Sequence, residues 1–155
     1  MKVGRVLLIG YGNPGRLDDG LGPALAEAIE HKSFKNVTVD SNYQLTVEDA
    51  AEIAEHDVVI FADASVNSDE PFTFKSITPK VVNTFSSHSI EPDVVLGFAY
   101  DLFQAKTKGY AFAIRGYEFN EFGEKLSSKA QDNLISAVEF LSELLTTKNF
   151  DRFDH

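Results

Sequence analysis

The sequence contains no cysteine, and this absence removes several kinds of chemistry at once. A chain without cysteine has no disulfide, no thiolate metal site and no cysteine nucleophile. It also lacks an apolar run of the length that a membrane-spanning helix needs, and the short apolar run near Met1 does not fit a secretory signal followed by a cleavage site. We therefore expect a soluble, cytoplasmic protein with no membrane partner.

Positive charge is also scarce, because 14 Lys and Arg residues stand against 24 Asp and Glu residues, which gives a net charge of -10. Such a chain repels phosphates, which argues against nucleic acid as a partner. An acidic, solvated surface accounts for this charge in the simplest way. The length of 155 residues is most simply one domain, residues 1–155, with a substantial single core.

Apolar patterning predicts strands and helices in alternation. Alternation of this kind favours an α/β domain with a mostly parallel sheet, and ligands of such sheets bind beyond the carboxyl ends of the strands. The fourth strand alternates apolar and polar residues, as an edge strand does. The expected strands cover 3–9, 36–40, 57–62, 71–77 and 110–117, and the expected helices cover 23–31, 46–55, 91–103 and a long final helix capped by Ser127 or Ser128 with Leu134, Ile135, Val138, Leu141 and Leu145 on its apolar face.

The most informative segment is the glycine-rich turn at 10–23, GYGNPGRLDDGLGP, which leaves the first strand. Its first six residues fit the dinucleotide pattern GxGxxG. However, Pro14 has no N–H to offer a phosphate, and Asp18 and Asp19 place negative charge where a pyrophosphate needs positive potential. A turn that gathers carboxylates is better suited to a cation. A nucleotide-binding module, with Asp40 as the ribose acceptor, is the alternative.

Three polar residues follow strand ends and should meet at one edge of the sheet: Asp19, Asp63 and His88. Each also has a structural interpretation, since Asp63 can cap the segment after its strand and His88 can bond locally. Two carboxylates with one imidazole suit a divalent ion. For Asp18 we expect a structural role, in which it braces the turn through its own backbone.

The remaining chemistry-bearing residues have simpler interpretations. His31, His56 and His155 are expected at the surface, and Ser87 beside His88 offers no hydrolase triad. Asn13 and Gln44 either position a substrate amide or brace a turn.

Three segments of the chain carry a family resemblance: GYGNPGRLDDGLGPALAEAI at 10–29, YQLTVEDAAEIAEHDVVIFADAS at 43–65 and SSHSIEPDVVLGFAYDLF at 86–103. In this order and spacing they resemble the [NiFe]-hydrogenase maturation endopeptidases. The resemblance implies a three-layer α/β/α sandwich of the phosphorylase/hydrolase-like kind and hydrolysis of a peptide bond. One departure is Asp40-Ser41-Asn42, where many members of the family have Asp-Gly-Gly.

The same resemblance implies a partner and a metal. The partner is the precursor of a hydrogenase large subunit, from which a C-terminal extension is removed after nickel insertion. Asp19, Asp63 and His88 correspond to the family's metal ligands, and the nickel would come with the substrate, although another divalent ion can occupy such a site. Asp19 and Asp63 are then the candidate catalytic carboxylates. A family member without catalytic activity that only binds its partner is a further alternative.

Overall fold

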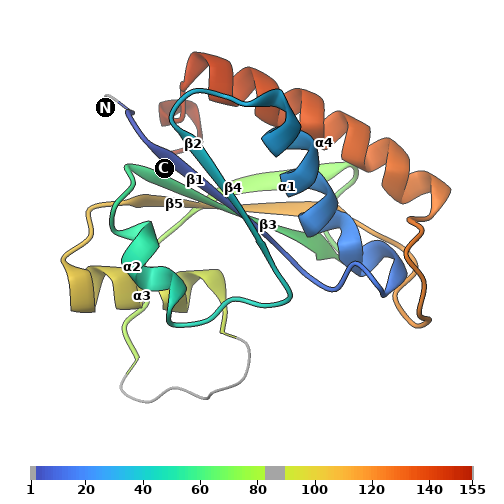
Figure 1. The fold of residues 1–155 in the computed structure, drawn as a ribbon, viewed down its shortest axis with the longest axis horizontal. Helices are drawn as coiled ribbons and strands as arrows, with labels where there is room; N and C mark the ends of the chain where they lie inside the picture. Colours follow the sequence, from blue (N-terminus) through green and yellow to red (C-terminus); the bar gives the residue numbers. More distant parts are fainter. Residues whose placement is uncertain (1–2, 83–89, 155) are drawn as a thin grey trace.

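The computed structural model describes residues 3–82 and 90–154. Within these residues, five strands form one sheet in the order β2-β1-β3-β5-β4 (Figure 1). The edge strand β4 runs antiparallel to β5, and the other neighbours are parallel. The strands are β1 (Val6–Tyr11), β2 (Val37–Asn42), β3 (Val58–Ser65), β4 (Phe72–Ile77) and β5 (Lys108–Arg115).

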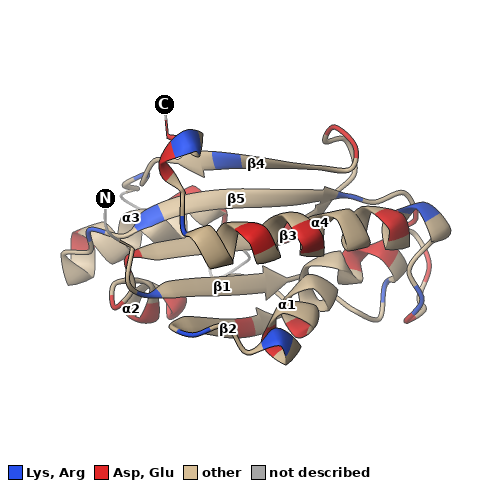
Figure 2. Ribbon diagram, turned by 90° about the horizontal axis from the view of Figure 1, so that it is seen from above, with Lys and Arg blue, Asp and Glu red and all other residues tan. Residues whose placement is uncertain are grey.

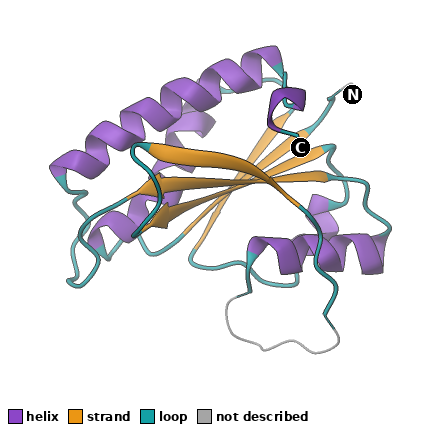
Figure 3. Cartoon of the chain, turned by 180° about the vertical axis from the view of Figure 1, so that it is seen from behind, coloured by secondary structure: helices purple, strands orange, loops and turns teal. Residues whose placement is uncertain are grey.

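Helices cover both faces of this sheet, which confirms the predicted α/β/α sandwich (Figure 3). One face is covered by α1 (Leu21–Lys32) and α4 (Ser128–Thr147), and the other by α2 (Asp49–Ile53) and α3 (Pro92–Phe103). Two short 3-10 helices complete the chain, η1 (Leu17–Gly20) before α1 and η2 (Asp151–Phe153) near the C-terminus. Among the described residues, no helix has both the length and the apolar character of a membrane span.

The apolar run of β1 is explained by burial on both faces. Val6 and Leu8 pack into the core under α1 and α4, whereas Leu7 and Ile9 pack into the core under α2 and α3. All four side chains are fully buried, as the central strand of a parallel sheet requires. Charged residues lie mainly on helices and loops, and the middle of the sheet carries few of them (Figure 2).

Several boundaries differ from prediction because neighbouring polar groups take the backbone bonds. β1 begins at Val6 rather than at residue 3, since the N–H groups of Gly4 and Arg5 donate to the Asp57 carboxylate at 2.9 and 2.8 Å. The helix expected at 46–55 is regular only over α2, because turns with i to i+3 bonds flank it on both sides.

Two predictions about single residues are wrong, and one cap is confirmed. Ile135 on α4 is 59% exposed instead of facing the core, and His56 is buried instead of lying at the surface. Its ring Nδ1 bonds the Glu52 carbonyl at 2.8 Å, which satisfies the buried imidazole. Ser127 caps α4 as expected, and its hydroxyl accepts from the Ala130 N–H at 3.3 Å.

Candidate active site

The turn after β1 folds back so that Asp19 lies beside the end of that strand. Gly12 has φ 138°, and a Cβ there would lie 2.2 Å from the Asp19 carbonyl oxygen, so this position requires glycine. The N–H of Asn13 donates to Asp19 Oδ2 at 2.8 Å. The Asn13 side chain accepts from the Gly15 N–H at 2.8 Å. Asn13 therefore braces the turn, and the turn orients the Asp19 carboxylate.

Asp18, the neighbouring carboxylate, is fully buried and bonds the loop between β5 and α4 instead of lining the cavity of Asp19. It accepts from the N–H groups of Tyr117 and Glu118 at 2.8 and 3.0 Å. It also accepts from the Ser127 N–H at 2.8 Å and the Ser127 hydroxyl at 2.7 Å. The predicted structural role is confirmed, but its partners were predicted wrongly, because they lie about a hundred residues away and not in the turn itself.

These bonds also set the protonation state of Asp18. Burial by itself would raise the pKa of this carboxyl, but the bonds from Ser127, Glu118 and Tyr117 outweigh burial and lower it. Asp18 is therefore a buried anion that ties the glycine turn to the loop after β5.

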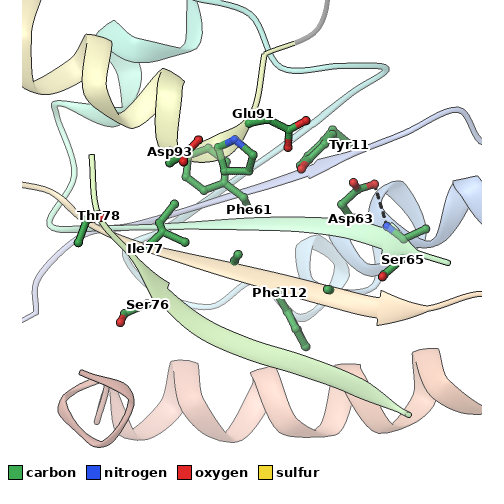
Figure 4. A pocket seen from close by; sticks show the side chains of 14 residues that line it. Tyr11, Phe61, Asp63, Ser65, Ser76, Ile77, Thr78, Glu91, Asp93 and Phe112 are labelled. Atoms are coloured by element: carbon green, nitrogen blue, oxygen red, sulfur yellow. Dashed lines mark hydrogen bonds between the residues drawn. The ribbon is translucent and has the colours of Figure 1, made fainter. Parts of the chain in front are cut away.

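Asp63 is held within β3, at the point where that strand leaves β1. Pairing with β1 ends at Ala62, whereas pairing with β5 continues to Ser65. The carboxyl Oδ1 accepts from the N–H of the next residue, Ala64, at 2.8 Å (Figure 4). Asp63 is thus a strand residue at the carboxyl edge of the sheet, with its side chain on the α3 side.

Asp19 and Asp63 meet at one cavity, as the sequence predicted for two of the three site residues. This cavity encloses about 290 Å³. Its other lining residues come from the ends of β1 and the connections before α2 and α3: Tyr11, Gly12, Tyr43, Gln44, Leu45, Ile90 and Glu91. His88 lies outside the described residues, so its place in the site stays a prediction. Within 3–82 and 90–154, no three His, Asp or Glu side chains group closely enough to hold a metal ion.

The electrostatics of this cavity single out Asp63. Burial raises the pKa of its carboxyl to about 7, and the negative charges of Asp19 and Glu91 add to this effect. The Ala64 N–H and the Tyr11 hydroxyl oppose it only in part. A carboxyl with a pKa near neutrality can accept a proton in catalysis, and its charged form would be stabilised by a cation.

Sequence reasoning missed two residues of this site, Tyr11 and Glu91. Figure 4 shows the Tyr11 side chain beside Glu91 and Asp63. Burial and these two carboxylates raise the pKa of the Tyr11 hydroxyl far above its ordinary value, so it remains a hydrogen-bond donor. Both residues had a positional signal, since Tyr11 ends β1 and Glu91 immediately precedes α3, at the same edge of the sheet.

The glycine turn is acidic where it meets α1, because Asp18 and Asp19 lie in η1 directly before that helix, and a pyrophosphate would meet negative charge there. A Cβ on Gly22 would lie 2.4 Å from the Tyr11 carbonyl oxygen and 2.6 Å from that of Ala62, so the first turn of α1 packs directly on the strand ends. Asp40, the residue proposed for a ribose, bonds the Glu52 side chain. This bond, together with burial and the neighbouring negative charges, raises the pKa of Glu52 to about 7.

Comparison with solved structures identifies proteins of the same fold. The chain matches no protein-family model and no curated protein sequence. Among solved structures, it is similar to the [NiFe] hydrogenase maturation protease HycI from Thermococcus kodakarensis KOD1, with a TM-score of 0.72 and 21% identity over 93% of this chain and 94% of that one.

Two further structures agree. The hydrogenase maturating endopeptidase HybD from E. coli gives a TM-score of 0.68 and 21% identity over 94% of both chains. The hydrogenase 2 maturation peptidase from a Thaumarchaeota archaeon gives 0.67 and 20% identity, over 92% of this chain and 98% of that one. Because the sequence identities are this low, the structural similarity establishes the shared fold alone. The chain therefore has the fold of the hydrogenase maturation proteases, as the motif resemblance implied.

Proposed function

We propose that this protein is a cytoplasmic endopeptidase that removes the C-terminal extension of a nickel-loaded [NiFe]-hydrogenase large-subunit precursor. The observation that carries the proposal is the meeting of Asp19 and Asp63 at one cavity, in the fold of proteins named as hydrogenase maturation proteases. The motif blocks at 10–29, 43–65 and 86–103 supply the link to that family.

The donor set fits a divalent cation. Asp19 and Asp63 bring two carboxylates close enough that the charge of one raises the pKa of the other, and a cation between them would relieve this repulsion. His88 is proposed as the third ligand. Oxygen ligands with one imidazole suit a borderline divalent ion such as nickel, which the substrate would supply.

The reaction is hydrolysis of one peptide bond. Water adds to the scissile carbonyl carbon while a carboxylate of the Asp19 and Asp63 pair takes its proton. The proton then passes to the leaving nitrogen as the carbon–nitrogen bond breaks, which yields a new carboxylate and a free amine. A cation supplied by the substrate would be held by Asp19, Asp63 and His88, where its chemistry would be to polarise the carbonyl or the water. Tyr11, a donor held beside Asp63, orients that carboxyl.

The direct test is incubation with a nickel-loaded precursor and with the same precursor lacking nickel, followed by intact mass measurement. Shortening of the nickel-loaded form alone is expected. If neither form is shortened but the nickel-loaded form binds, the protein is a non-catalytic partner. If NAD(H) or a mononucleotide raises the melting temperature while the precursor is neither bound nor cut, the nucleotide alternative holds.

A further inference from the structure

The α3 side of β5 is open along part of its length, although β5 lies between β3 and β4. At the start of the strand α3 packs closely, since a Cβ on Gly109 would lie 2.7 Å from Leu96 Cδ2. Further along, Ala111 and Ala113 on the same face are only half-buried. On the opposite face, the intervening side chain of Phe112 is fully buried. The small side chains of Ala111 and Ala113 leave this part of the sheet surface accessible.

This open surface forms a groove of about 600 Å³ (Figure 4). Its floor includes Phe61, Ala111 and Ala113, and Ile77 lies on the β4 side. The start of α3, with Asp93, forms the opposite wall. This volume lies in the range of ligand-binding clefts. It is enough for a side chain together with the backbone that carries it.

The groove is continuous with the candidate active site. Tyr11, Asp63 and Glu91 line both the groove and the cavity that contains Asp19. Asp63 therefore lies at the junction of the two spaces. A peptide whose scissile bond lies at Asp63 and which continues into the groove would pass over Ala113 and Ala111 on one side of that bond.

The charges of the groove restrict what can lie in it. Its described lining carries the carboxylates Asp63, Glu91 and Asp93 and no lysine or arginine. An acidic side chain would meet like charge there, whereas an aliphatic side chain would bury apolar surface against the alanine and phenylalanine floor.

We propose that this groove binds the substrate segment on one side of the scissile bond, that it selects an aliphatic residue and rejects an acidic one, and that Ala111 and Ala113 set its depth. The proposal rests on the proposed endopeptidase function and identifies the part of the protein that reads the sequence next to the cut.

The first experiment fills the groove. Ala111→Leu should lower kcat/KM on a nickel-loaded precursor at least about tenfold, the size of effect typical of misfit in an apolar pocket. Its melting temperature should stay close to that of the wild type, because the added atoms enter open space. The matched control is Ala51→Leu, the same change at an exposed position of α2, and it should cleave like the wild type. Ala113→Val is a second, smaller filling variant.

The second experiment leaves the protein unchanged and alters the substrate. Residues flanking the cut are replaced one at a time by Asp and, separately, by Asn. At one position on one side, Asp should reduce cleavage at least about tenfold more than Asn, and Asp93→Asn in the protein should recover part of that difference.

These outcomes separate the two claims. A wild-type protein that cuts no precursor refutes the endopeptidase function and the groove proposal together. A wild-type protein that cuts, with Ala111→Leu and Ala113→Val equally active and with Asp and Asn equivalent at every flanking position, refutes the groove proposal alone.

Discussion

The raised pKa of Asp63 predicts that Asp63→Asn makes the protein more stable at alkaline pH while it removes activity. The change exchanges a carboxyl for an amide of the same shape. The amide oxygen can still accept from the Ala64 N–H, which bonds Asp63 at 2.8 Å. What is lost is a negative charge that burial, Asp19 and Glu91 all disfavour.

The magnitude follows from the pKa in the two states. The folded pKa is about 7 and the ordinary value is 3.8, so the folded state binds more protons than the unfolded state between these pH values. The free energy of unfolding therefore falls as pH rises through this window, and the loss is complete above pH 7. At about 1.4 kcal/mol per tenfold change in acidity, the loss is about 4 kcal/mol. Since a half-buried amide has its own desolvation cost, we expect a gain of about 2–4 kcal/mol for Asp63→Asn at pH 8.

The assay is urea unfolding of the wild type and of Asp63→Asn at pH 8 and near pH 4, with a chelator present so that no cation offsets the charge. The gain should be present at pH 8 and nearly absent at the acidic pH. Asp132→Asn, at an exposed site on α4, is the control and should change stability by less than about 0.5 kcal/mol at either pH. An Asp63→Asn protein that is no more stable than the wild type at pH 8 would refute the account of this cavity.

Two other predictions concern the turn and the metal. Asp18→Asn should lose about 3 kcal/mol of stability, measured by the same unfolding assay, because an amide nitrogen would face donors from Tyr117, Glu118 or Ser127. The pKa of Asp18 is lowered in the folded state, so its contribution to the free energy of unfolding should be present above its ordinary pKa and lost as pH falls through the folded value. Unchanged stability in Asp18→Asn would contradict the structural role of this buried carboxylate. Ni²⁺ or Cd²⁺ should raise the melting temperature of the wild type and have little effect on that of Asp63→Asn. At a metal concentration a hundred times Kd, the stabilisation of the wild type is about 2.7 kcal/mol. Equal shifts in both proteins would show that the metal binds elsewhere.

The fold could be predicted because local patterns and tertiary packing agree over most of the chain. The run 58–62 is apolar throughout and is buried on both faces, and the alternating run 72–77 is an edge strand. Predicted boundaries are wrong where a residue far away in the sequence determines the local hydrogen bonds. The expected end of β5 at 117 moves to Arg115, and Tyr117 donates to Asp18 instead of continuing the strand.

The candidate site was predictable in part for a related reason. The carboxyl ends of the parallel strands β1 and β3 lie at the same edge of the sheet, so the sequence pattern was enough to place Asp19 and Asp63 together. The orientation of Asp18 could not be predicted, because its partners are separated from it by 99 to 109 residues. The burial of Tyr11 and the approach of Glu91 depend in the same way on how α3 packs over the sheet.

The central claim is tested most directly by the cleavage of one nickel-loaded large-subunit precursor by three proteins: the wild type, Asp63→Asn and Asp132→Asn. Each reaction is followed by the intact mass of the precursor, with thermal melts to show that all three proteins are folded. The wild type and Asp132→Asn should shorten the precursor at one site, and Asp63→Asn should leave it intact although this variant is the most stable of the three at pH 8. Cleavage by Asp63→Asn at the wild-type rate would contradict the catalytic role of Asp63.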